Sequence, residues 1–207
     1  MDGLSIQLIA LVMSPRSYSM QRRSEHVTQT RQRIVDAATE LFSKQGARAT
    51  TMNEVARLAG VSPTTVSNHF AAQEQLIEAV VDRVLADIQV PNSTIFNGVR
   101  SLTGRLGVLT TSMYAFFERT SHWFELLGAE LVEVPPLARA EAAFWASVQQ
   151  LYEQALGGSN DDLLAKTTAG LLHPATFAAL KAAGMSADEA AAVVAGLLAH
   201  QAKGGHR

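Results

Sequence analysis

The sequence predicts an all-α protein, in which three short N-terminal helices precede a larger helical bundle. Apolar residues recur at helical spacing from Arg31 onward, and no stretch alternates between apolar and polar residues as a half-buried strand would. Glycine, proline and capping signals divide the chain into segments of helical length. A chain of 207 residues is long enough to bury an adequate core without disulfides or metals.

The composition excludes several classes of protein. The chain has no cysteine, which rules out a disulfide framework, a thiolate metal site and a cysteine nucleophile. Its net charge of −2 is unevenly distributed: residues 1–70 hold 8 Lys and Arg against 5 Asp and Glu, and residues 71–207 hold 9 against 14. A basic front and an acidic body fit an N-terminal part that faces nucleic acid. Nothing indicates export, and we expect a cytoplasmic protein.

Residues 1–29 are predicted to be a poorly ordered extension. The apolar run at 4–13 is shorter than the roughly 20 residues that span a bilayer, and Asp2 precedes it where a signal peptide has basic residues. We therefore expect no membrane association. The alternative is an arm whose arginines approach DNA phosphates or the minor groove, namely Arg22, Arg23 and Arg31.

Two short helices are predicted between Arg31 and Gly60. Thr51, followed three residues later by Glu54, forms a capping box at the start of the second helix, and Gly60 ends it. In the first helix one face is apolar and a glycine caps the end. The apolar residues are Ile34, Ala38, Leu41 and Phe42, and the cap is Gly46.

A third short helix is predicted to begin after Ser62, whose side chain caps it. Pro63 takes the first position, where a missing N–H costs nothing, and Val66 and Phe70 form the inner face. Two helices of about eight residues joined by a glycine turn have the dimensions of a helix-turn-helix, whose second helix enters the major groove of DNA.

The outer face of this third helix is polar. Its short side chains are able to form hydrogen bonds with phosphates and base edges. Structural interpretations stay open, since the threonines also suit a helix start and the histidine also suits a buried position. The residues are Thr64, Thr65, Ser67, Asn68 and His69.

Residues 30–80 resemble the N-terminal domain of the tetracycline-repressor (TetR) family over their whole length. The resemblance implies a helix-turn-helix DNA-binding domain over 30–75 and a ligand-binding and dimerisation domain over 76–207. It also implies a homodimeric repressor on a palindromic operator in double-stranded DNA, released by a small-molecule effector. The matching residues are Leu41-Phe42, Gly46, Thr51, Val55-Ala56, Gly60-Val61-Ser62, Thr65, His69-Phe70, Glu74 and Leu76.

By this resemblance, Thr51 and Asn53 near the start of the second helix join the polar residues of the third as DNA-binding residues. Asn53 and Asn68 are the best candidates for reading bases, because an amide both donates and accepts hydrogen bonds. The family usually has a phosphate-contacting tyrosine in place of Ser67 and a lysine in place of Gln73. The alternative function is therefore a TetR-like protein that has lost tight DNA binding and acts through a protein partner.

A fourth helix is predicted to carry an apolar band from Leu76 to Ile88 and to end before Pro91, and the chain is predicted to continue as a helical bundle. Residues 91–98 are rich in Pro, Asn, Ser and Gly and are predicted to be a connector. Ser186 and Glu189 form a second capping box, at the start of the last helix. Helices are predicted across 101–120, 122–133, 136–156, 161–172, 174–183 and 187–202.

Aromatic residues gather between residues 114 and 152, where the resemblance implies an effector pocket between the middle helices of the bundle. Core packing is the competing interpretation, because a bundle needs large apolar side chains whether or not it binds a ligand. No cluster of charges specifies the ligand, and we expect a small apolar or amphipathic effector. The predicted lining is Met113, Phe117, Trp123, Trp145 and Tyr152.

The last two predicted helices are rich in alanine, which allows helices to approach closely. The resemblance implies that these helices from two subunits form a four-helix interface. Dimerisation also has a physical reason, since two recognition helices must reach half-sites about 34–36 Å apart. The predicted interface residues are Leu180, Val193, Val194, Leu197 and Leu198, and packing within one subunit is the competing interpretation.

An enzyme is the main competing class, and the sequence offers little chemistry for one. It contains no Gly-x-Ser-x-Gly elbow, no phosphate-binding glycine loop and no His-Glu-x-x-His pair. His122 and Glu125 lie one helical turn apart, but a lone pair is more often a solvated contact than a metal site. We expect no catalytic residues, no metal and no cofactor.

Overall fold

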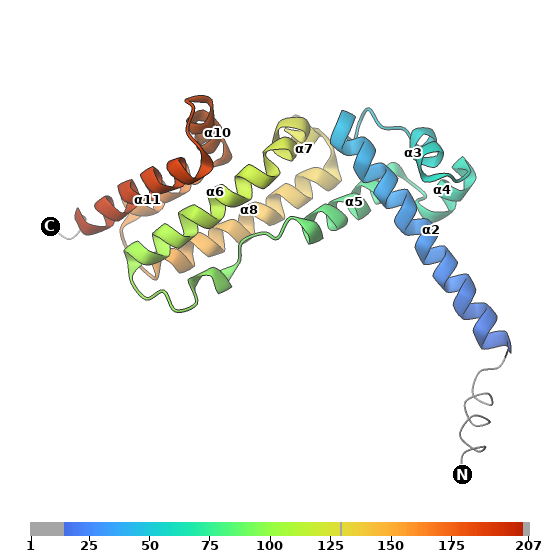
Figure 1. The fold of residues 1–207 in the computed structure, drawn as a ribbon, viewed down its shortest axis with the longest axis horizontal. Coiled ribbons are helices and arrows are strands. Elements are labelled where there is room, and N and C mark those ends of the chain that lie inside the picture. The colour runs from blue at the N-terminus through green and yellow to red at the C-terminus, as the bar shows by residue number, and fades with distance from the viewer. Residues whose placement is uncertain (1–14, 129, 205–207) are drawn as a thin grey trace, which may run out of the picture.

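The computed structural model describes residues 15–128 and 130–204, and every regular element in these ranges is a helix. The predicted all-α class is confirmed. The molecule is elongated, with α2, α3 and α4 at one end and α10 and α11 at the other (Figure 1). Among the helices in the described ranges, none combines the length and the apolar character that a membrane crossing needs.

Three helices form what we call the head: α2 (Pro15–Gln45), α3 (Met52–Ala59) and α4 (Pro63–His69). The predicted capping box of α3 is confirmed, since the Glu54 N–H donates to Thr51 Oγ1 at 3.3 Å and the Thr51 N–H donates to Glu54 Oε2 at 2.8 Å. The Thr51 N–H, and then its hydroxyl, lower the pKa of the Glu54 carboxyl. Gly60 ends α3 with φ 65°, a left-handed conformation that favours glycine.

The start of α2 corrects the sequence prediction. The helix begins at Pro15 and not at Arg31, so residues 15–29 are helical where an unordered extension was expected. The rest of that extension, residues 1–14, lies outside the described residues. Residues 16–30 contain no glycine or proline, and lengthening an existing helix costs far less than starting one. The first turns of α2 therefore extend past the other helices of the head (Figure 1).

The head is held together by a hydrophobic core to which α5 (Gln73–Asp87) also contributes. Val66 and Phe70 are fully buried in it, as predicted, and they hold α4 against the core of the head. Val134 and Leu137, from much later in the chain, belong to the same core. The head and the bundle therefore share an apolar boundary.

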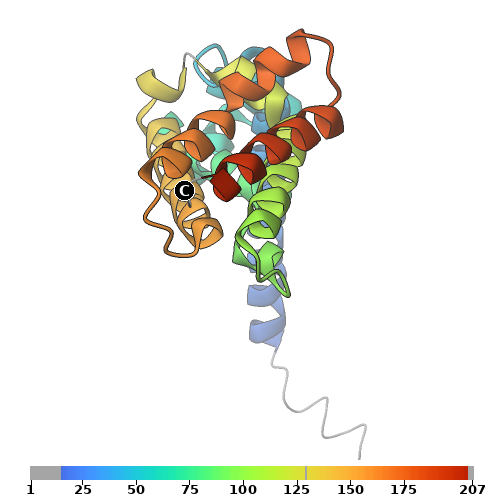
Figure 2. The ribbon, with the colours of Figure 1, turned by 90° about the vertical axis from the view of Figure 1, so that its left-hand side faces the viewer.

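The remaining helices form the bundle, with a second hydrophobic core. α11 lies along α6, and Figure 2 looks onto this end of the molecule with the red α11 in front. The elements are η1 (Ser93–Phe96), α6 (Leu102–Leu127), α7 (Glu130–Glu133), α8 (Pro135–Leu156), α9 (Asp162–Leu171), α10 (Pro174–Ala182) and α11 (Ala187–Gly204).

One predicted boundary between helices is wrong, since α6 (Leu102–Leu127) crosses it and only Glu130–Glu133 form a separate helix, α7. α6 runs without interruption through residue 121, although separate helices were expected over 101–120 and 122–133. No glycine or proline lies at the expected junction, and the Thr120 hydroxyl donates to the Phe116 carbonyl within the helix at 2.8 Å. The helix ends only at Leu127, before Gly128.

The capping box at the start of α11 is confirmed. The Ser186 N–H donates to Glu189 Oε2 at 2.8 Å, and the Glu189 N–H donates to Ser186 Oγ at 3.2 Å. The Ser186 N–H, followed by the Ser186 hydroxyl, holds the pKa of Glu189 below its ordinary value.

This lowered pKa predicts a pH-dependent contribution to stability. A carboxyl whose pKa is lower in the folded state stabilises the fold above its unfolded pKa of about 4.3, and the contribution disappears as the pH falls through the folded value. Glu189→Gln should therefore lower Tm by about 1–3 °C at pH 7 and by less at about pH 3. Thermal melts at both pH values test this, and a Tm difference independent of pH would contradict it.

Candidate nucleic-acid interface

The outer face of α4 is the polar surface predicted for DNA. Val66 and Phe70 anchor the helix from below, while Thr64, Ser67 and Asn68 are exposed. Ser62 caps the helix by accepting a hydrogen bond from the Thr65 N–H at 3.0 Å. A helix of seven residues is unstable alone, so its orientation depends on this cap and on the two buried side chains.

Three of the seven predicted DNA-binding residues use their hydroxyls within the protein. Thr51 belongs to the capping box of α3. The Thr65 hydroxyl lies 2.8 Å from that of Ser62, and the Ser67 hydroxyl donates to the Pro63 carbonyl at 3.2 Å. These side chains support the two helices, which leaves less of their hydrogen-bonding capacity for another molecule.

The other four predicted residues keep their hydrogen-bonding groups available. Within the described part of the chain, their side chains form no hydrogen bond to other protein groups. Three of the four are exposed and the fourth, a histidine, is half-buried at the end of α4. These residues are Asn53, Thr64, Asn68 and His69.

Gln73 has a structural role at the position where the family usually has lysine. Its Nε2 donates to the carbonyl oxygens of Ala47 at 3.1 Å and Thr50 at 3.0 Å. The amide thus joins the start of α5 to the loop between α2 and α3. A side chain engaged in this way supports the head rather than contacting phosphate.

Basic residues flank the recognition surface. The Arg31 guanidinium lies 4.3 Å from the centre of the Phe70 ring, an attractive cation–π arrangement at the C-terminal end of α4. Arg57 on α3 and Arg23 on α2 are exposed. Positive charges beside a polar helix suit the phosphates on either side of a DNA groove.

A carboxylate from α7 accepts two hydrogen bonds from the loop between α2 and α3. Glu130 Oε2 accepts the Ala47 N–H at 2.8 Å, and Oε1 accepts the Arg48 N–H at 3.1 Å. A Cβ on Gly46 would lie 2.6 Å from Glu130 Oε1, and Gly46 has φ +84°, so both space and backbone geometry favour glycine there. We call this contact the Glu130 clamp. The sequence carries no local signal for it, because its partners are more than 80 residues apart.

Other polar contacts reinforce the boundary between head and bundle. His122, which the sequence pairs with Glu125, has its Nε2 2.7 Å from the Ser43 carbonyl oxygen and so contacts the end of α2. An ion pair joins Arg48 to Glu133. Among the residues that the structure describes, no three His, Asp or Glu side chains are grouped as a metal site would require.

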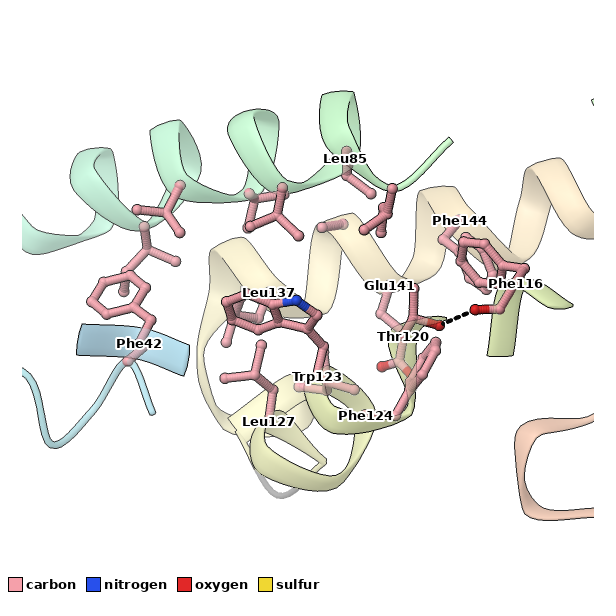
Figure 3. Close-up of a pocket in the computed structure, with 18 residues that line it drawn as sticks. Phe42, Leu85, Phe116, Thr120, Trp123, Phe124, Leu127, Leu137, Glu141 and Phe144 are labelled. Carbon is pink, nitrogen blue, oxygen red and sulfur yellow. Dashed lines mark hydrogen bonds between the residues drawn. The ribbon is translucent and has the colours of Figure 1, made fainter. Parts of the chain in front are cut away.

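An apolar cavity of about 120 Å³ lies where α5, α6 and α8 meet the end of α2 (Figure 3). Phe42 and Ala47 of the head form part of its wall, together with Val84 of α5. Of the five residues predicted to line an effector pocket, Trp123 alone lines this cavity. The cavity lies closer to the head than the sequence suggested.

The other four predicted lining residues lie elsewhere. Met113 and Tyr152 are buried in the bundle core, and the Tyr152 hydroxyl donates to a main-chain carbonyl 2.8 Å away. Burial raises the pKa of Tyr152. Phe117 is also buried in that core, while Trp145 stacks on His173 with 5.5 Å between ring centres. The structure thus places these four residues away from the cavity beside the head, and Phe117 also lines a second pocket, between α6 and α10.

The predicted dimer residues divide into two groups. Val193 and Leu197 lie one turn apart on α11 and are 49% and 55% exposed. Val194 and Leu198 are buried in the bundle core, and Leu180 is half-buried against it. Only the first group is accessible to a second subunit in this arrangement.

Two short helices joined by a left-handed glycine, with a polar outer face on the second, define a helix-turn-helix protein. A family model described as "Bacterial regulatory proteins, tetR family" matches residues 34–80. The HTH-type transcriptional regulator BetI of Rhizobium meliloti is 41% identical over 59 residues, 28% of this chain and 29% of BetI. UidR of Escherichia coli is 36% identical over 66 residues, 30% of this chain and 34% of UidR.

The match therefore spans only about a third of the length of these curated relatives. The fold extends the similarity to the bundle. A structure described as a TetR-family transcriptional regulator from Rhodococcus sp. aligns with a TM-score of 0.55 and 24% identity, over 83% of this chain and 97% of that one. Residues 34–80 thus match the TetR family of bacterial regulatory proteins, and the fold of the chain is similar to that of a TetR-family structure.

The Glu130 clamp makes a testable contribution to stability. Glu130→Gln should lower the free energy of unfolding by about 1–3 kcal/mol, because an amide has one acceptor oxygen and would turn its NH₂ toward the second N–H. Urea unfolding followed by circular dichroism measures the change. Glu133→Gln is the matched control: it removes an exposed ion pair of the same helix, worth at most about 1 kcal/mol. Equal losses in the two variants would contradict a special role for Glu130.

Proposed function

We propose that the chain is a sequence-specific transcriptional regulator, a repressor that binds a palindromic operator as a homodimer and leaves it when a small molecule binds the bundle. The observation that carries this proposal is the outer face of α4, where polar groups without internal partners stand on a firmly anchored helix. A second helix of this kind lies in the major groove and contacts base edges. We assign 30–75 to DNA binding and 76–207 to ligand binding and dimerisation.

The uncommitted side chains support distinct roles in this proposal. Asn53 and Asn68 read base edges, since an amide matches the donor and acceptor pair of adenine. Thr64 and His69 contact phosphates or bases beside them. Thr51, Thr65 and Ser67 hold the two helices in shape, and any contact they make with DNA is secondary.

The boundary position of the cavity supports a mechanism of release. A typical small-molecule site is about 300–1,000 Å³, so most ligands that enter a cavity of about 120 Å³ must move its walls. Two of those walls are Phe42 and Ala47, next to the Glu130 clamp. A ligand that prefers the widened state thereby favours a different position of the head, and operator affinity falls.

A protein partner in place of DNA is the competing function. The internal hydrogen bonds of Ser67 and Gln73 favour it, because they replace two phosphate contacts usual in the family. Selection of duplexes from a random library at about 0.15 M salt separates the two functions. Enrichment of one palindrome, with affinity that falls steeply as salt is added, supports DNA binding, and the absence of any preferred sequence excludes it.

A substitution on α4 tests the assignment of base reading. Asn68→Ala should weaken binding to the selected palindrome by about 1–3 kcal/mol per half-site and relax the preference at one base pair. Asn160→Ala, an exposed asparagine in the loop between α8 and α9, is the control and should bind as the wild type does. Unchanged specificity in Asn68→Ala would remove Asn68 from the recognition surface.

A second substitution tests the dimer. Leu197→Glu places a charge on the exposed face of α11 and should shift the protein to monomer in sedimentation experiments, with loss of cooperative operator binding. Val27→Glu, at a 51% exposed position on α2, is the matched control and should stay dimeric. A dimer that tolerates Leu197→Glu would place the interface on another surface.

A further inference from the structure

One ionisable side chain lies in the wall of the apolar cavity. Among the described residues that line it, Glu141 on α8 alone carries a charge. The polar side chain beside it, Thr120, already donates to the Phe116 carbonyl at 2.8 Å, the dashed line in Figure 3. Glu141 forms no hydrogen bond or ion pair with any residue in the described ranges, so its carboxylate depends on water.

The position of Glu141 follows from the register of α8. Leu137, Glu141 and Phe144 follow one another at spacings of four and three residues, so they share the face that lines the cavity. In Figure 3 Glu141 lies beside Thr120 and Phe124 of α6. The side chain is half-buried and forms part of the wall of a cavity whose surface is otherwise apolar.

Nearby carboxylates on the same boundary are paired. Glu78 and Glu133 form ion pairs with Arg139 and Arg48, and Glu130 accepts two main-chain N–H groups. Glu141 is therefore a negative charge for which the neighbouring structure supplies no partner. A bound ligand is a natural source of one.

Ligand binding would change the surroundings of this charge. A molecule that fills the cavity removes water from the carboxylate, and a buried charge without a partner is costly. A neutral ligand leaves that cost in place and an anion adds repulsion, whereas a cation forms an ion pair in a water-poor site. The aromatic rings of Trp123, Phe124 and Phe144 also line the cavity, and ring faces attract cations.

We propose that the cavity takes a lipophilic cation: a small aromatic or alkyl body with one positive charge placed against Glu141. The inference rests on the proposed function and names the chemical class of its effector. A cavity of about 120 Å³ is close in size to the roughly 150 Å³ space that holds benzene in an engineered protein core. A single ring with a short ammonium arm is therefore the smallest ligand that both occupies the apolar volume and reaches the carboxylate.

Three probes of similar size and different charge test this class: 2-phenylethylammonium, 2-phenylethanol and 3-phenylpropanoate. Calorimetric titration of the full-length protein measures each affinity. The ammonium should bind about tenfold or more tightly than the alcohol, which corresponds to one charge-assisted hydrogen bond. The carboxylate probe should bind more weakly than both.

Glu141→Gln keeps the shape of the side chain and removes its charge. The variant should lose about tenfold in affinity for the ammonium and less than about twofold for the alcohol. Glu153→Gln, on the exposed side of the same helix, changes the net charge equally and should affect neither probe. Equal losses in both variants would show a long-range charge effect and overturn the assignment to Glu141.

Operator affinity measured with each probe separates this inference from the proposed function. If the ammonium and alcohol bind equally and Glu141→Gln changes neither, or if no probe binds, the cation inference fails. If the ammonium and the alcohol bind equally and both release the operator, the proposed function survives that failure. If the ammonium binds through Glu141 and leaves operator affinity unchanged, the cation site stands and its regulatory role is wrong.

Discussion

The burial of Val66 and Phe70 is the interaction on which the rest of the molecule depends. α4 is too short to be helical by itself, and its polar face is useful only if its backbone is fixed. Two buried side chains, a serine cap and the left-handed turn at Gly60 fix it. Three residues of the outer face, Thr64, Asn68 and His69, then have no structural hydrogen bond to make and keep unpaired donors and acceptors within the described chain. The outer face of α4 can carry unpaired polar groups because the buried face of the helix supplies its stability.

The boundary between head and bundle combines two kinds of contact. Apolar side chains of α7 and α8 complete the core of the head, and the Glu130 clamp adds directional hydrogen bonds at one loop. The cavity interrupts this packing beside Ala47, next to the loop that the Glu130 clamp holds by two hydrogen bonds. In the proposed mechanism, a small change in the cavity acts on this contact and, through it, on the position of the head.

Local chemistry made much of this architecture predictable. The capping boxes at Thr51 and Ser186, the turn at Gly60 and the anchors of α4 depend on residues within a few positions of one another. The length of α2 was mispredicted because a polar helix without a buried face has no apolar period to reveal it. The Glu130 clamp and the hydrogen bonds of Gln73 join distant segments and leave no local pattern. Glu141 does leave one, a charge within the apolar register of α8.

The continuity of α2 gives the molecule a mechanical property. Its 31 residues form a rod about 46 Å long, secured near its last turn by the loop that Glu130 grips. A tilt of about 10° around that pivot displaces the far tip by about 8 Å, although the atoms at the pivot hardly move. A small tilt of α2 at the boundary thus becomes a large displacement at its outermost turns, around Met20.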